Sequence, residues 1–182
     1  MILIFIGYSI ISKRTVTIIQ ARMGSKRFLG KVLAKLNKKP VIEYLIELAE
    51  SLPFPFVVAT PDTEDNQPLW DYLALEMVNT FKGHETDLLD RFLKCAIQYK
   101  ADIIIRLCAD TPFITHTDVM LQLGYYEQTG KFTYGNGVYI FSTAELKDAY
   151  FNAKHSKQRE HIIPFMIKCI DYEEDLERWQ KV

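Results

Sequence analysis

The sequence predicts an α/β fold in which a mostly parallel sheet carries helices on both faces. Short runs of β-branched residues are apolar throughout, which is typical of strands that are buried on both faces. Stretches with helical periodicity alternate with these runs along the chain. Strand, helix and strand in this order imply right-handed crossover connections, which lay successive strands parallel to one another.

Three buried strands are expected, over residues 15–19, 56–59 and 103–105. Each of them leads toward a stretch with a helical pattern. Parallel sheets bind ligands at the carboxyl ends of their strands. We therefore expect the site in the loop after the first strand and in the residues that follow Ala59 and Leu107.

Helices are expected over residues 41–50, 68–77 and 86–99. The first follows Pro40, which suits the start of a helix. The third is the clearest, because its apolar residues recur at i, i+1, i+4, i+5, i+8 and i+9 and form one stripe. Thr86 is the expected N-cap of that helix.

The length of the chain suits a single domain. Its 182 residues, 48% of them hydrophobic, can form a substantial core, which we expect within residues 14–182. Residues 1–13 are expected to be an N-terminal extension. The extension opens with an apolar run that is shorter than the roughly 20 residues of a membrane span, and it lacks the features of a secretory signal.

Charge is balanced overall but unevenly distributed along the chain. The 22 Lys and Arg residues nearly match the 23 Asp and Glu residues, which argues against nucleic acid or an anionic membrane as a partner. Nine cations and no acid lie within residues 1–42. Such a basic segment indicates a bound anion of several charges, with a solvated basic surface as the alternative. The three cysteines lie far apart without zinc-ligand spacing, which fits a reducing cytoplasm.

Residues 20–31, directly after the first strand, contain four cations and two glycines. Backbone N–H groups in a turn that glycine permits can point at an anion, and Arg or Lys adds charge-assisted hydrogen bonds. The spacing is that of neither a Walker A loop nor a dinucleotide-binding loop. The segment predicts a phosphate site, and an exposed surface loop is the alternative.

Five motifs, in order, resemble those of the sugar cytidylyltransferases, above all the spore-coat polysaccharide (SpsF-like) and acylneuraminate cytidylyltransferases. The motifs lie at residues 19–27, 30–33, 57–62, 88–92 and 101–114. The resemblance implies a Rossmann-like three-layer α/β/α nucleotidyltransferase fold. It also implies CTP as the nucleotide donor and Mg²⁺ as the cofactor.

The resemblance assigns roles to residues at the expected edge of the sheet. Arg22 and Lys31 would be catalytic cations on the triphosphate, with Arg27 as a third candidate. Asp110 would bind Mg²⁺, because a hard carboxylate suits a cation that bridges phosphate oxygens. Without the resemblance, an Asp before Thr-Pro is more typical of a turn or cap. The remaining nucleotide-binding candidates are Ala21, Gly24, Ser25, Thr60 and Arg106.

Asp90 and Arg91 resemble a family pair near the nucleotide. They fall inside the helix expected over residues 86–99, however, where an acid beside a base more often forms an exposed pair. Arg91 is therefore a secondary candidate.

The second half of the chain contains weaker matches. Asn136 aligns with a residue that faces the sugar, although Gly-Asn-Gly at this point also suits a plain turn. Arg159 is a further sugar-binding candidate, and Asp171 is the candidate for a second Mg²⁺ carboxylate. The chain is shorter than the family before Asn136 and before Asp171, where family members build the sugar pocket and the dimer arm.

The sequence therefore predicts a Mg²⁺-dependent cytidylyltransferase that transfers CMP from CTP to a sugar and releases pyrophosphate. The expected acceptor is a nonulosonate-type or related cell-surface monosaccharide, used in polysaccharide or glycoconjugate synthesis. Two alternatives stay open: a degenerate nucleotide-binding protein without an acceptor site, and a GT-A glycosyltransferase. The latter ordinarily carries Asp-x-Asp where this chain has Ala109-Asp110-Thr111. If the chain oligomerises, a homodimer is the expected assembly.

Overall fold

The computed structural model describes residues 13–25 and 28–160. Nearly all of the expected N-terminal extension lies outside the described residues, and so do Arg27 and Asp171.

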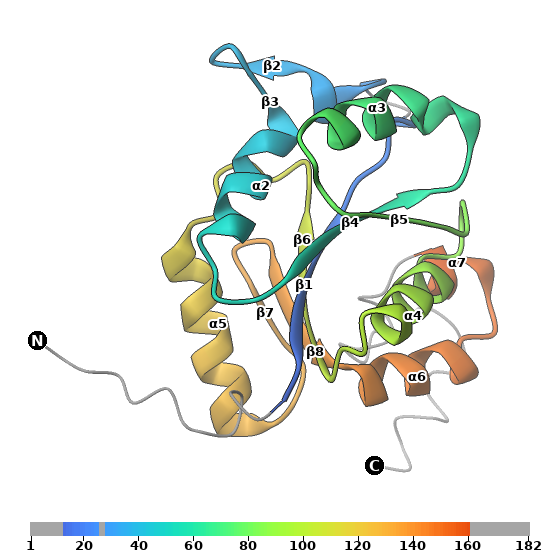
Figure 1. Ribbon diagram of the computed structural model, residues 1–182. Helices are drawn as coiled ribbons and strands as arrows, with labels where there is room; N and C mark the ends of the chain where they lie inside the picture. The colour runs from blue at the N-terminus through green and yellow to red at the C-terminus, as the bar shows by residue number, and fades with distance from the viewer. Residues whose placement is uncertain (1–12, 26–27, 161–182) are drawn as a thin grey trace, which may run out of the picture.

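A six-stranded sheet forms the centre of the molecule (Figure 1), in the order β5-β4-β1-β6-β8-β7. The first four strands in that order run parallel, whereas β8 runs antiparallel to both β6 and β7. The expected mostly parallel sheet is therefore confirmed. The strands are β1 (Thr15–Gln20), β4 (Phe56–Pro61), β5 (Thr80–Gly83), β6 (Ile103–Cys108), β7 (Thr133–Gly135) and β8 (Val138–Ser142).

Helices cover both faces of this sheet and complete the three layers (Figure 1). On one face, α2 (Val41–Glu50), α3 (Gln67–Leu75) and α5 (His116–Thr129) pack on the strands. On the other, α4 (Leu88–Gln98) and α6 (Thr143–Asn152) bury the second hydrophobic cluster, and α7 (Ser156–Glu160) packs against α4. Each central strand contributes apolar side chains to both clusters, which explains why its sequence is apolar without alternation.

The N-cap of helix α4 lies one residue after the cap expected at Thr86. Asp87 has extended backbone angles, and its carboxylate accepts a hydrogen bond from the Asp90 N–H at 2.9 Å, so Asp87 is the N-cap. The Thr86 N–H instead donates to His84 Nδ1 at 3.3 Å. Thr86 therefore belongs to the turn before the helix, and the expected cap was wrong.

Two short hairpins complete the fold. The first joins β2 (Lys35–Leu36) to β3 (Lys39–Pro40), after the 3-10 turn η1 (Lys31–Leu33). The second joins β7 to β8 through Asn136 and Gly137, whose φ angles are 50° and 83°. Positive φ at both central residues is what a two-residue hairpin turn requires. The turn expected in Gly-Asn-Gly is therefore present.

None of the helices within the described residues has the length and apolar character needed to cross a membrane. Cys95 and Cys108 are both free thiols.

Candidate functional site

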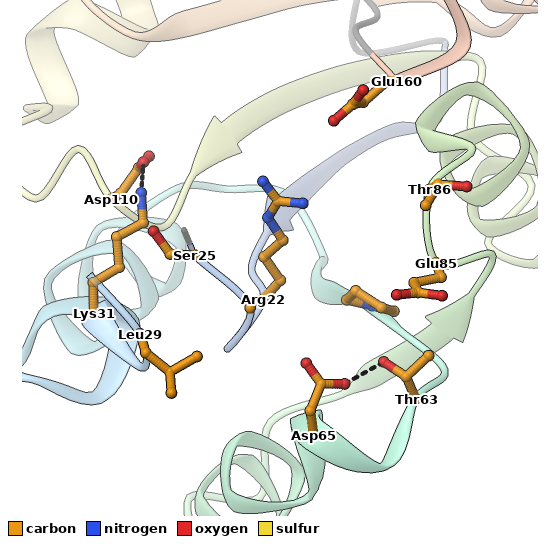
Figure 2. Close-up of a pocket in the computed structure, with 12 residues that line it drawn as sticks. Arg22, Ser25, Leu29, Lys31, Thr63, Asp65, Glu85, Thr86, Asp110 and Glu160 are labelled. Carbon is orange, nitrogen blue, oxygen red and sulfur yellow. Dashed lines mark hydrogen bonds and ion pairs between the residues drawn. The ribbon is translucent and has the colours of Figure 1, made fainter. Parts of the chain in front are cut away.

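A cavity of about 670 Å³ opens at the carboxyl ends of β1, β4 and β6. The segments that the sequence singled out after these three strands meet there, as expected from the rule for parallel sheets. Figure 2 shows twelve residues of its wall. They are Arg22, Gly24, Ser25, Leu29, Lys31, Pro61, Thr63, Asp65, Glu85, Thr86, Asp110 and Glu160.

Two hydrogen bonds from its backbone N–H groups hold the loop after β1 at this cavity. The Met23 N–H donates to the side-chain oxygen of Asn66 at 2.9 Å, and the Gly30 N–H donates to the Met23 carbonyl at 2.9 Å. Gly30 has a φ of 69°, a left-handed conformation that glycine adopts without strain. The loop therefore folds back on itself and presents Arg22, Ser25 and Lys31 to the cavity (Figure 2).

Asp110 follows β6 and faces the cavity rather than capping its own turn. The local turn is closed by Thr111, whose N–H and hydroxyl both donate to the Cys108 carbonyl, at 3.0 and 2.6 Å. The Asp110 carboxylate instead forms an ion pair with the Lys31 ammonium (Figure 2). The two side chains are 44% and 28% exposed, respectively, so both groups are within reach of a ligand.

Arg22 lies between the two walls of the cavity (Figure 2), and a second guanidinium stands close by. Arg91 is only 2% exposed, and its guanidinium donates to the carbonyls of His84, at 2.9 and 2.6 Å, and Glu85, at 2.6 Å. Burial, and then the charge of Arg22, lowers the pKa of Arg91 to about 10. Arg91 thus fixes the segment that carries Glu85 into the cavity.

The expectation of an exposed Asp90 and Arg91 pair is wrong. Asp90 is 6% exposed and Arg91 is 2% exposed. Asp90 pairs with Lys94, one helical turn further on, at 2.9 Å. Arg91 turns away from the helix toward carbonyl groups, because the loop after β5 packs over it. Gly83 allows this contact, since a Cβ there would lie 2.8 Å from Arg91 Cγ.

Acidic side chains line the part of the cavity away from Lys31. Asp65 follows β4, Glu85 precedes α4, and Glu160 ends α7. In Figure 2 these three carboxylates surround Arg22 on the sides away from Lys31 and Asp110. The cavity therefore has Lys31 and Asp110 on one side, Arg22 in the middle, and the other three carboxylates beyond Arg22.

Three of the predicted nucleotide-binding residues lie outside the cavity wall. Ala21 is 2% exposed, and its N–H donates to the Ala59 carbonyl at 3.2 Å. Thr60 is fully buried, with its hydroxyl accepting from the Trp70 indole at 2.8 Å. Arg106 is 6% exposed, and its guanidinium donates to Gln20 Oε1 at 3.1 and 2.7 Å. Ala21 belongs to the core cluster just after β1. Thr60 and Arg106 lie in strands, where side chains alternate between the two faces, and both are buried within the layers of the fold.

The two predicted sugar-binding residues also lie off the cavity wall. Asn136 donates to Asp118 Oδ1 at 2.7 Å, beside the capping box of α5. The Arg159 guanidinium pairs with Asp87 at 2.6 Å and donates to the Tyr150 carbonyl at 2.9 Å. Arg159 thereby ties α7 to the start of α4 and positions Glu160, its neighbour, at the cavity.

A magnesium ion needs few protein ligands in such a site. The described residues contain no group of three His, Cys, Asp or Glu side chains that could hold a metal alone. Mg²⁺ commonly binds through one or two carboxylates together with substrate phosphates and water. The exposed carboxylate of Asp110, beside Lys31 in the cavity wall, fits a metal that arrives with a phosphate ligand.

Several residues of the cavity wall were not predicted from the sequence as site residues, namely Leu29, Pro61, Thr63, Asp65, Glu85, Thr86 and Glu160. The rule for parallel strands pointed to the segment after β4, but Thr60 was the only site candidate named there. No sequence signal brings Glu85 or Glu160 to the same place, because the packing of the segment before α4 and of α7 determines their position.

A model of the cytidylyltransferase family matches residues 16–173. The chain belongs to the cytidylyltransferase family. The resemblance indicated by the five motifs is therefore confirmed, and so is the nucleotidyltransferase fold. Among solved structures, a cytidylyltransferase from Leptospira borgpetersenii superposes with a TM-score of 0.77 at 26% identity, covering 91% of this chain and 73% of that one.

Three relatives of this chain illustrate the range of the family. An uncharacterised protein of Methanocaldococcus jannaschii is 33% identical over 162 residues, which cover 84% of this chain and 67% of the relative. The spore coat polysaccharide biosynthesis protein SpsF of Bacillus subtilis is 36% identical over 125 residues, with coverages of 64% and 52%. A 3-deoxy-manno-octulosonate cytidylyltransferase of Trichlorobacter lovleyi is 39% identical over 101 residues, with coverages of 54% and 39%. This chain thus spans about half the length of the spore-coat relative.

Proposed function

We propose that this cytidylyltransferase transfers CMP from CTP to a hydroxyl group of a sugar and releases pyrophosphate. The observation that carries the proposal is that Arg22, Lys31 and Asp110, from two different loops, line one cavity at the carboxyl ends of the strands. In-line attack on the α-phosphorus requires that the charge of the triphosphate be neutralised and the departing pyrophosphate stabilised. The charges of these three residues suit both tasks.

The charges in the cavity favour one orientation of CTP. The triphosphate would lie over Arg22 and Lys31, where backbone N–H groups of the loop and cationic side chains attract it. The nucleoside would lie toward Asp65 and Glu85, since these carboxylates repel phosphates and accept hydrogen bonds. Interactions with Arg22 and Lys31 strengthen as negative charge gathers on the pyrophosphate, which lowers the barrier.

Mg²⁺ is the proposed cofactor, and Asp110 would hold it. When bound there, the ion supplies neutralisation of phosphate charge and orientation of the phosphate oxygens. Lys31 is then free to leave Asp110 and to bind the triphosphate. Arg91 contributes from behind the cavity wall, because its buried charge adds to the attraction that Arg22 exerts on anions.

We propose an acidic sugar of the nonulosonate type, or a related cell-surface monosaccharide, as the acceptor. The name of the Trichlorobacter lovleyi relative contains an octulosonate, which is an acidic sugar, and that of the Bacillus subtilis relative a spore-coat polysaccharide, so the two names support an acidic or cell-surface sugar in general. A reducing cytoplasm, where CTP is made, is the proposed location, and a homodimer is the proposed assembly if the chain associates with itself.

Pyrophosphate release tests this function. The full chain is incubated with CTP and Mg²⁺ and offered a panel of acidic and neutral sugars. Release that depends on both the metal and one acceptor supports the proposal. Two further measurements separate the alternatives. If calorimetry shows that CTP binds while no sugar supports turnover, the result favours a nucleotide-binding protein. If the protein consumes a nucleotide-sugar in an activity assay, the result favours a glycosyltransferase.

A further inference from the structure

Asp65 stands in the cavity wall with one of its two carboxylate oxygens already occupied. Oδ1 accepts hydrogen bonds from the Thr63 hydroxyl and from the Asn66 side-chain amide, the latter at 3.0 Å. Oδ2 lies over Gly24, where a Cβ would come within 3.3 Å of it. No cation within residues 13–25 and 28–160 forms an ion pair with Asp65. Two hydrogen bonds therefore orient the carboxylate through Oδ1, and within the described part of the chain no cation pairs with Oδ2.

Asn66 connects this carboxylate to the loop after β1. Its side chain is fully buried, and its amide nitrogen donates to Thr63 Oγ1 at 2.9 Å as well as to Asp65. Its amide oxygen accepts from the Met23 N–H at 2.9 Å. One buried side chain thus fixes the distance between Asp65 and the loop that carries Arg22. A ligand bound by that loop would therefore lie at a defined position relative to the Asp65 carboxylate.

An ionised carboxylate accepts hydrogen bonds and repels phosphate oxygens. Its proper partner on a nucleotide is an O–H or N–H group of the nucleoside. In CTP these donors are the ribose hydroxyls and the 4-amino group of cytosine. UTP shares the hydroxyls but carries a carbonyl oxygen at position 4, which a carboxylate would repel.

We propose that Asp65 is a specificity-determining residue that accepts a hydrogen bond from a donor group of the CTP nucleoside. The proposal rests on the proposed function, because it presumes that the cavity binds CTP with its phosphates on the loop after β1. Thr63 and Asn66 are positioning residues for this contact. The contact makes the cavity select a nucleoside as well as a triphosphate.

Asp65→Asn tests the contact with almost no change of shape. The amide oxygen can still accept from Thr63 and Asn66, while an N–H₂ donor replaces Oδ2 at the cavity. The matched control is Asp62→Asn, which changes an exposed carboxylate of the same loop that does not line the cavity. Dissociation constants of CTP, UTP, 2′-deoxy-CTP and 3′-deoxy-CTP are measured by calorimetry with Mg²⁺ present, and thermal unfolding shows that each variant is folded.

Asp65→Asn is expected to weaken CTP binding roughly ten- to a hundredfold, the range for one hydrogen bond to a charged group. If the partner is the 4-amino group, UTP binding strengthens in the variant, because the new N–H₂ group meets a carbonyl oxygen. If the partner is a ribose hydroxyl, the substitution weakens the binding of CTP and of UTP alike. It then leaves unchanged the binding of the deoxynucleotide that lacks that hydroxyl. Either pattern supports the proposal.

Equal CTP affinities in Asp65→Asn, Asp62→Asn and the unmodified protein would overturn the proposal and leave the proposed function standing. Failure of the unmodified protein to bind CTP would overturn both. Thr63→Val, which keeps the charge of Asp65 but removes one of its two hydrogen bonds, is expected to give a smaller loss of CTP affinity than Asp65→Asn. A larger loss of CTP affinity in Thr63→Val than in Asp65→Asn would also count against the contact.

Discussion

The ammonium of Lys31 and the carboxylate of Asp110 form an ion pair that joins the loop after β1 to the loop after β6 (Figure 2). These two residues are 79 positions apart in the sequence. Without ligand, the lysine neutralises the carboxylate that is proposed to hold Mg²⁺. The proposed binding of Mg²⁺ with its nucleotide would require both residues to exchange partners, the carboxylate for the metal and the lysine for the phosphates.

Asp110→Ala is expected to abolish metal-dependent pyrophosphate release and to leave the protein folded. The exposed ion pair with Lys31 contributes only about 0–1 kcal/mol to the free energy of unfolding, so its loss costs little stability. Pyrophosphate release as a function of Mg²⁺ concentration, together with a thermal unfolding curve, measures both effects. A variant that turned over at the rate of the unmodified protein would show that Asp110 does not hold the metal.

Lys31→Met is expected to strengthen metal binding in the absence of nucleotide and to weaken turnover in its presence. Removing the ammonium leaves Asp110 without its cation, so the carboxylate attracts a metal ion more strongly. Manganese binding, followed by electron paramagnetic resonance without CTP, measures the first effect. Unchanged manganese binding would mean that the ion pair does not compete with the metal.

Arg22→Ala is expected to lower kcat by roughly a hundredfold, the usual cost of removing one group that stabilises developing charge. CTP binding should weaken less, because the charge on the departing pyrophosphate grows along the reaction. Steady-state kinetics combined with calorimetry of CTP separates the two quantities, and Arg22→Lys serves as the conservative comparison. Equal losses in binding and in kcat would indicate that Arg22 binds substrate and transition state alike.

Arg159→Ala is expected to lower the free energy of unfolding by about 1.5–3 kcal/mol, the range for hydrogen bonds to a charged group. The variant loses the partly buried ion pair with Asp87, which also caps α4. Denaturant unfolding measures this loss. Unchanged stability with a raised KM for the acceptor sugar would instead support the direct sugar contact predicted from sequence.

The sequence was most informative about the strands. β1, β4 and β6 were all predicted at the right place, because a strand buried on both faces leaves a continuous apolar run. The strand β5 was not predicted, because it lies at the edge of the sheet and its residues are only partly buried. Helix ends depended on a choice between neighbouring caps: Thr86 and Asp87 both suit the role, and the turn formed by His84 decides between them.

The sequence by itself determined the class of the fold, the family, and the two loops that bring Arg22, Lys31 and Asp110 to one edge of the sheet. These follow from local patterns, since periodicity and short motifs depend on residues close together in the chain. Only the tertiary structure decided that Thr60 and Arg106 turn into the layers, and that Asp65, Glu85 and Glu160 join the cavity wall. The positions of these side chains depend on how elements far apart in the sequence pack together. Local sequence patterns do not contain that information.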